Sequence, residues 1–205
     1  MDNLLEHYRD VQAGLIPTQI RGEPVWNTPE RPLFKGWAFK NYLYKPFMKL
    51  TREWESVRVL DHGCGKAFYL HEDAFIGATM HRRMNGRLQS WYCYDPGHRP
   101  YMNLPEKGAK FNALISAGVM SVVPEKDIDR TFAEMRDWME PDGIAFFKIP
   151  LTAKQERCFI GTNQSVYITV RPPEYWLEKL NTILCRRYYV TFADSPSKQI
   201  KYKRL

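Results

Sequence analysis

VRVLDHGCG (Val57–Gly65) joins a short apolar run to a loop that contains two glycines. The β-branched and apolar residues of Val57–Leu60 predict a strand. The residues after the loop predict a helix over Phe68–Met84, which Asn85 and Gly86 end because both tolerate left-handed backbone angles. A strand, a glycine loop and a helix in this order are typical of the first unit of a parallel α/β sheet.

The alternation of strands and helices continues along the rest of the chain. It predicts strands, helices and a C-terminal hairpin at these places: strands Leu88–Tyr94, Phe111–Ser116 and Ile144–Ile149, helices Ile128–Met139 and Glu174–Ile183, and a hairpin of Arg187–Ala193 with Lys198–Leu205. Pro141–Gly143 predicts a turn before the strand at Ile144. We therefore expect an α/β fold with a mostly parallel sheet, right-handed crossovers and an antiparallel C-terminal hairpin.

The connection between Asp95 and Phe111 is unusually short. It spans 111 − 95 = 16 steps and contains Pro100, Pro105 and Gly108. This length cannot hold a helix, a further strand and another helix. One edge of the sheet should therefore be reduced.

The N-terminal segment, residues 1–52, is predicted to be a lid or substrate-docking part of a single domain that covers residues 1–205. A short helix is expected over Leu4–Val11, and four prolines between positions 17 and 32 keep the next stretch from forming one regular element. Apolar spacing over Gly36–Thr51 predicts a second helix, interrupted near Pro46.

Composition sets the broad class of the protein. The chain has 205 residues, of which 44% are hydrophobic and 26% charged, as in folded globular domains. It has no signal-like start and no apolar run long enough to span a bilayer, so we expect a cytoplasmic protein. Its four cysteines form no C-x-x-C pair, and His62, His71 and His81 match no zinc spacing, so no metal site is expected. A net charge of +7 suits a polyanionic partner, but lysines on an edge strand also prevent aggregation, and both explanations stay open.

The glycine loop excludes two kinds of phosphate-binding site. A dinucleotide fingerprint needs a third glycine where Phe68 stands, and a P-loop needs a glycine at Leu60 and a hydroxyl residue at Ala67. The loop lies at the carboxyl end of a strand, where glycines let a ligand approach the main chain and exposed N–H groups bind it.

Four segments resemble the class I (Rossmann-like) S-adenosylmethionine-dependent methyltransferases. Val59–Gly65 resembles their first motif, Tyr94–Pro96 the acidic end of strand 2, Phe111–Pro124 the strand 4 region, and Met139–Gly143 the turn before strand 5. The Gly-Cys-Gly-Lys loop is similar to that of short bacterial and phage methyltransferases. The resemblance implies S-adenosyl-L-methionine as cofactor, with Asp95 on the ribose, bound by Asp61, Gly63, Cys64, Gly65, Asp95, Pro96, Ser116, Ala117 and Val119.

Some residues depart from the family pattern. Ala67 replaces a glycine, Asn112 an aspartate, and Val122 a histidine common among relatives, so a cofactor-binding protein without activity is one alternative. No catalytic residue is identified; His62, Tyr44 and Trp37 are the candidates.

The methyl acceptor is only partly constrained. Ser116-Ala117-Gly118-Val119 stands where amino-methylating DNA enzymes carry an Asp/Asn/Ser-Pro-Pro-aromatic motif, and no cysteine follows a proline as in cytosine-C5 enzymes. These differences argue against DNA base methylation. We expect a small or flexible acceptor, with RNA as an alternative that the net positive charge favours.

Overall fold

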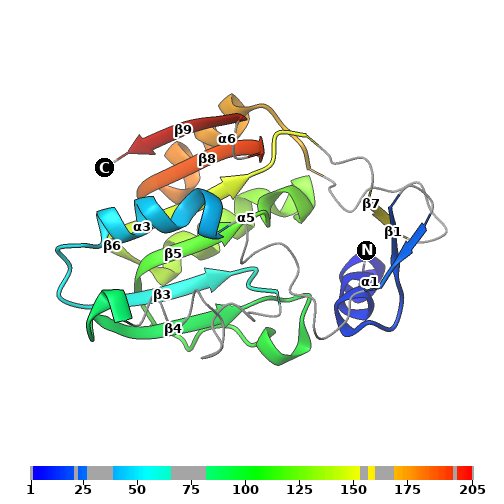
Figure 1. Cartoon of the computed structure of the whole chain (residues 1–205), viewed down its shortest axis with the longest axis horizontal. Coiled ribbons are helices and arrows are strands. Elements are labelled where there is room, and N and C mark those ends of the chain that lie inside the picture. The colour runs from blue at the N-terminus through cyan, green and yellow to red at the C-terminus, as the bar shows by residue number, and fades with distance from the viewer. Residues whose placement is uncertain are drawn as a thin grey trace.

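The computed structural model describes residues 2–20, 23–26, 39–65, 82–152, 157–159, 169–195 and 198–204. Its main feature is a six-stranded sheet with the order β4-β3-β5-β6-β8-β9 (Figure 1). The strands are β3 (Val57–His62), β4 (Leu88–Tyr94), β5 (Phe111–Ala117), β6 (Met139–Ile149), β8 (Arg187–Ser195) and β9 (Lys198–Arg204). All neighbouring pairs are parallel except β8 and β9, which form the antiparallel C-terminal hairpin. The predicted α/β class and the hairpin are confirmed.

The reduced edge is confirmed as well. A doubly wound sheet of order 3-2-1-4-5-6 has one more strand beyond its second strand. Here β4 is the outermost strand, and residues 95–110, all described, contain only the 3₁₀ turn η3 (Arg99–Tyr101). The Tyr92 hydroxyl donates to the carbonyls of Asn103 and Leu104, so this connection lies beside β4.

Helices cover both faces of the sheet, because the central parallel strands bury apolar residues on each side. One face carries α5 (Glu125–Trp138), α6 (Pro173–Lys179) and the π-helical turn η5 (Leu180–Leu184). The other carries the π-helical turn η1 (Phe39–Leu43) and α3 (Tyr44–Leu50). In α5, Ile128, Phe132 and Met135 recur at helical spacing and are fully buried.

A small second sheet, of order β2-β1-β7, contains β1 (Thr18–Ile20), β2 (Glu23–Val25) and β7 (Arg157–Phe159). Because β1 pairs with β7, it joins the N-terminal segment to the connection between β6 and α6. Figure 1 shows this sheet and α1 (Asp2–Ala13) beyond the carboxyl ends of β3 and β4.

Residues 39–50 of the N-terminal segment pack against the core. Phe39, Leu43 and Phe47 are fully buried against the main sheet. Pro46 is the third residue of α3, and η1 runs directly into that helix, so the missing N–H and the ring of Pro46 affect the carbonyl of Tyr42 in η1. The irregular turn is η1, just before α3.

The predicted turn at Pro141–Gly143 is wrong. These residues form the bulged start of β6, where residues 140–143 lie opposite Asn112 alone, between the pairs Phe111–Met139 and Ala113–Ile144. A side chain at Gly143 would lie 3.1 Å from the carbonyl oxygens of Asn112 and Glu140, so glycine permits this close approach.

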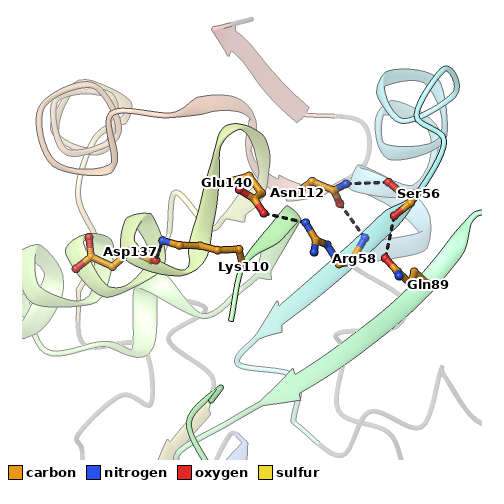
Figure 2. A network of polar contacts seen from close by, with 7 residues as sticks. All are labelled: Ser56, Arg58, Gln89, Lys110, Asn112, Asp137 and Glu140. Carbon is orange, nitrogen blue, oxygen red and sulfur yellow. Dashed lines mark hydrogen bonds and ion pairs between the residues drawn. The ribbon is translucent and has the colours of Figure 1, made fainter. Parts of the chain in front are cut away.

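A polar network joins the amino ends of β3, β4, β5 and β6 (Figure 2). The Asn112 amide accepts from the Arg58 N–H at 2.8 Å and donates to the Ser56 carbonyl at 2.8 Å. Arg58 also pairs with Glu140, and Ser56 donates to Gln89.

Most of the predicted helix Phe68–Met84 lies outside the described residues; Arg82–Met84 are helical. Asn85 and Gly86 have φ angles of 47° and 78°, as expected of residues that end a helix. None of the helices in the described ranges has the length and apolarity of a membrane span.

Candidate functional site

The order of the strands places a crevice between β3 and β5. From β3 the chain continues to β4, which lies on one side of this pair. From β5 it continues to β6, which lies on the other side. Such a reversal leaves a gap outside the carboxyl ends of the two strands, where open α/β sheets bind their ligands. The loops at this point are residues 63–65 after β3 and residues 117–119 around the end of β5.

The two loops meet at Gly63 and Val119. Gly63 has a φ angle of +68°, and a Cβ there would lie 2.3 Å from Val119 Cγ2. A side chain at position 63 is therefore disfavoured both by the backbone conformation and by the contact with Val119.

Gly65 and Gly118 border space that no described atom fills. Their φ angles are +58° and +78°, and a Cβ built on either meets nothing within 4 Å. Backbone that is open on this side lets a ligand approach the main chain closely, so the loops fit a bound cofactor.

The loop amides are already used within the protein. The N–H groups of Gly63 and Cys64 donate to the Tyr94 carbonyl at 2.7 and 3.2 Å, and that of Gly65 donates to Asp95 Oδ2 at 2.7 Å. The expectation that these N–H groups point at a ligand is therefore wrong. Their bonds to the end of β4 instead hold the loop in one shape.

Asp95 links this loop to the turn after β4. Its Oδ2 accepts from Gly65 and its Oδ1 from the Gly97 N–H at 2.8 Å. An ionised carboxylate has about four lone-pair sites, so acceptor capacity remains for a ligand hydroxyl. Asp95 is half-buried and borders the crevice loop.

The other predicted cofactor residues lie on both sides of the crevice. Asp61, Cys64 and Ser116 are buried, with exposed fractions of 0%, 1% and 0%, and Ala117 is 6% exposed. The Ser116 hydroxyl has no hydrogen-bond partner among the described residues. Asp61 and Cys64 lie at the end of β3 and in the loop after it, and Ser116 and Ala117 lie at the end of β5.

The N-terminal helix contacts the turn after β4. Arg9 Nε donates to the Pro96 carbonyl at 3.1 Å, and a Cβ at Gly97 would lie 3.7 Å from Tyr8 Cβ. The helix α1 therefore covers the turn that carries Asp95 and Pro96.

The two candidate catalytic residues that the structure describes, His62 and Tyr44, lie on opposite faces of the sheet. His62 is 4% exposed and lies on the α5 face of the sheet, with its ring 5.5 Å from that of Tyr94 and 6.4 Å from that of Trp138. Tyr44 is half-buried and lies against Phe39 and Arg83. Trp37 lies outside the described residues.

Tyr94, the last residue of β4, is a titratable group beside the glycine loop. Burial raises the pKa of its hydroxyl above the ordinary value of 10.0, and the negative charges of Glu134 and Asp95 raise it further. The hydroxyl is therefore a neutral hydrogen-bond donor at physiological pH.

Three contributors were not predicted from the sequence. Gly118 lies two residues after the predicted strand Phe111–Ser116, and that position is a signal that could have identified it. Arg9 and the Tyr94 carbonyl had no such signal, because their roles depend on contacts with distant parts of the chain.

No family model and no curated protein matches the chain. Among solved structures, it is similar to PKMT2 from Rickettsia typhi in complex with AdoHcy, with 21% identity and a TM-score of 0.29 over 45% of this chain and 21% of that chain. A second structure of PKMT2 is 19% identical, with a TM-score of 0.31 over 51% of this chain and 25% of that chain. The [4+2]-cyclase SpnF is 18% identical, with a TM-score of 0.41 over 88% of this chain and 68% of that chain. All three TM-scores are below 0.5.

Proposed function

We propose that the protein binds S-adenosyl-L-methionine between the β3 and β5 loops and transfers its methyl group to a small or flexible acceptor. The observation that carries this proposal is a pair of glycines, Gly65 and Gly118, at the point where the strand order reverses; a Cβ on either would meet no described atom within 4 Å. Asp95 adds an acidic acceptor beside the same loop. The resemblance of Val59–Gly65 to the first methyltransferase motif supports the same ligand.

Each loop has a distinct part in binding. Asp95 would accept hydrogen bonds from the ribose hydroxyls, while Gly63–Gly65 and Ser116–Val119 would lie against the rest of the cofactor. When bound, the cofactor supplies a methyl group activated on a sulfonium centre. The bonds from the loop to Tyr94 and Asp95 hold the site in shape before the ligand arrives, which lowers the ordering cost of binding.

The chain's contribution to the reaction would be alignment of the acceptor and exclusion of water. Proximity and orientation alone are worth as much as about 7–11 kcal/mol. Catalysis by alignment suits a site in which His62, a candidate base, packs against Tyr94 and Trp138 on the α5 face.

Calorimetry with S-adenosylhomocysteine tests the cofactor assignment. We expect a micromolar dissociation constant, equivalent to about −8 kcal/mol. Asp95→Ala should weaken binding by about 1.5–3 kcal/mol, because it removes a charged acceptor. Asp142→Ala, an exposed carboxylate in the β6 bulge, is the matched control and should bind normally. No heat and no thermal shift at millimolar ligand would disprove the assignment.

Conversion of S-adenosylmethionine to S-adenosylhomocysteine in the presence of an acceptor tests activity. The alternative, a binding protein without activity, rests on Ala67, Asn112 and Val122. Asn112 no longer supports it, since this residue lies in the network at the amino ends of the strands, opposite the crevice. Cofactor binding without turnover on any acceptor would favour that alternative.

A further inference from the structure

Exposed lysines of α3 and β9 lie on the same face of the main sheet. In the β8–β9 register, Lys203 lies opposite Tyr189 and Lys201 opposite Thr191. Directly opposite residues share a face of the sheet, and Tyr189 packs in the core cluster formed with α3. Lys201 and Lys203 therefore project on the side that carries α3.

Two lysines of α3 extend this surface. Lys45 and Lys49 are exposed and four residues apart, so they lie on one side of the helix, away from the buried Phe47. Figure 1 shows α3 in front of β5 and β6, with β8 and β9 extending beyond it. We call Lys45, Lys49, Lys201 and Lys203 the basic face.

The positive charge of the basic face is not neutralised within the described part of the chain. None of its four lysines takes part in an ion pair there. Of the nearby acidic residues, Glu53 pairs with Arg52, and Asp194 accepts the N–H groups of Leu151 and Thr152. Protection of a sheet edge explains lysines on β9, but it does not explain those on a helix.

An aromatic ring lies among these charges. Tyr189 is half-buried and directly opposite Lys203. Basic side chains beside a partly exposed aromatic ring are typical of surfaces that bind single-stranded nucleic acid, where the charges contact phosphates and bases stack on rings. A membrane surface would need charge but no such ring.

We propose that the basic face binds single-stranded RNA. RNA is preferred to DNA because the loop after β5 lacks the residues of DNA base methyltransferases. The inference deepens the proposed function and rests on it in one respect: a bound strand would be the flexible methyl acceptor. Binding itself does not depend on the cofactor.

Fluorescence anisotropy with a labelled, unstructured RNA of about 20 nucleotides tests the proposal, because binding sites on such proteins span several nucleotides. Lys45→Glu/Lys49→Glu and Lys201→Glu/Lys203→Glu should each weaken binding about tenfold or more at low salt. Lys107→Glu/Lys126→Glu is the matched control, since both lysines are exposed and lie off the basic face. It makes the same change in net charge and should alter binding by less than about threefold.

The salt dependence supplies a second measurement. Lys201→Ala/Lys203→Ala should reduce the slope of log K against log salt by about 1.4, the value for two phosphate contacts to a single strand. Equal losses in the control and basic-face variants would overturn the proposal, because net charge alone would then explain binding. Equal affinity for DNA of the same sequence, or no RNA binding at low salt, would also overturn it. Competition between phosphatidylserine vesicles and RNA for the same lysines would overturn the proposal as well.

Cofactor binding separates this inference from the proposed function. The basic-face variants should bind S-adenosylhomocysteine like the wild-type protein. If the wild-type protein binds RNA but does not bind S-adenosylhomocysteine, the basic face is supported and the methyltransferase proposal is contradicted.

Discussion

Gly63 and Gly65 are two residues apart and both have left-handed backbone, yet their surroundings differ. A side chain at Gly63 meets Val119, whereas one at Gly65 meets no described atom. The first glycine is therefore needed for the fold, and the second leaves room for a ligand.

This difference predicts distinct effects of alanine at the two positions. Gly65→Ala should cost about 1–2 kcal/mol of backbone strain, lowering Tm by a few degrees, and should weaken S-adenosylhomocysteine binding. Gly63→Ala should lower Tm further, because its Cβ would lie 2.3 Å from Val119 Cγ2. Thermal melts and calorimetry measure the two effects.

Val119→Ala provides the control for the contact. The double variant Gly63→Ala/Val119→Ala should be more stable than the sum of its single changes predicts, since the clash is removed. Equal Tm values for Gly63→Ala and Gly65→Ala would contradict this account.

At the scale of elements, the amino ends of β3 and β5 are joined by one amide side chain. Asn112 uses its oxygen toward the Arg58 N–H and its nitrogen toward the Ser56 carbonyl (Figure 2). An aspartate, the residue usual in the methyltransferase family, could accept the first bond but could not donate the second.

Asn112→Asp should therefore reduce the free energy of unfolding by about 1–3 kcal/mol, the cost of leaving a partly buried carbonyl opposite a carboxylate. Cofactor affinity should not change, because the crevice lies at the other end of the strands. Gln89→Ala removes a more exposed bond of the same network and should cost less than about 0.5 kcal/mol. Urea unfolding measures these changes, and a loss of cofactor binding without a loss of stability would refute the structural role.

At the scale of the whole molecule, several tyrosine hydroxyls have been removed from water. Burial is the largest cause that raises the pKa above the ordinary 10.0 of each of these: Tyr42, Tyr94, Tyr101, Tyr175 and Tyr188. They belong to η1, β4, η3, α6 and β8, so the effect is spread over the fold.

The consequence is a loss of stability at high pH. The folded protein holds the protons of these tyrosines more tightly than the unfolded chain does. Their contribution to the free energy of unfolding is therefore complete below pH 10 and is lost as the pH rises through the folded pKa values. Stability should fall above about pH 10. The stability of Tyr94→Phe should fall less steeply with rising pH than that of the wild type. Denaturant unfolding from pH 8 to 11 measures the difference. A flat profile in the wild type would contradict the burial of these hydroxyls.

The arrangement of α1 is also a property of the whole molecule. Its Arg9 donates to Pro96 across 87 residues of sequence, and β1 pairs with β7 from the other half of the chain. These contacts place the N-terminal helix over the turn that carries Asp95.

The order and type of the main elements could be predicted from the sequence because their signals are local. Alternating apolar runs, glycines after strands and left-handed residues such as Asn85 depend on neighbours within a few positions. Val57–Gly65 alone indicated the first strand and its loop, and the short connection after Asp95 indicated the reduced edge. The bulge at residues 140–143 was missed, because a Pro-Asp-Gly run has the same local signal whether it forms a turn or lies within a strand.

The roles of individual residues depended on contacts between distant parts of the chain. Gly63 needs Val119, Gly65 is bonded to Asp95 across 30 residues, and His62 lies on the α5 face because the strand alternates its side chains. Lys45 and Lys201 share a face because the β8–β9 register places Lys201 opposite Thr191, on the face of the sheet that carries α3. Local patterns specify which elements form, whereas packing of the sheet and its helices decides which side chains meet, since that depends on register and crossover direction.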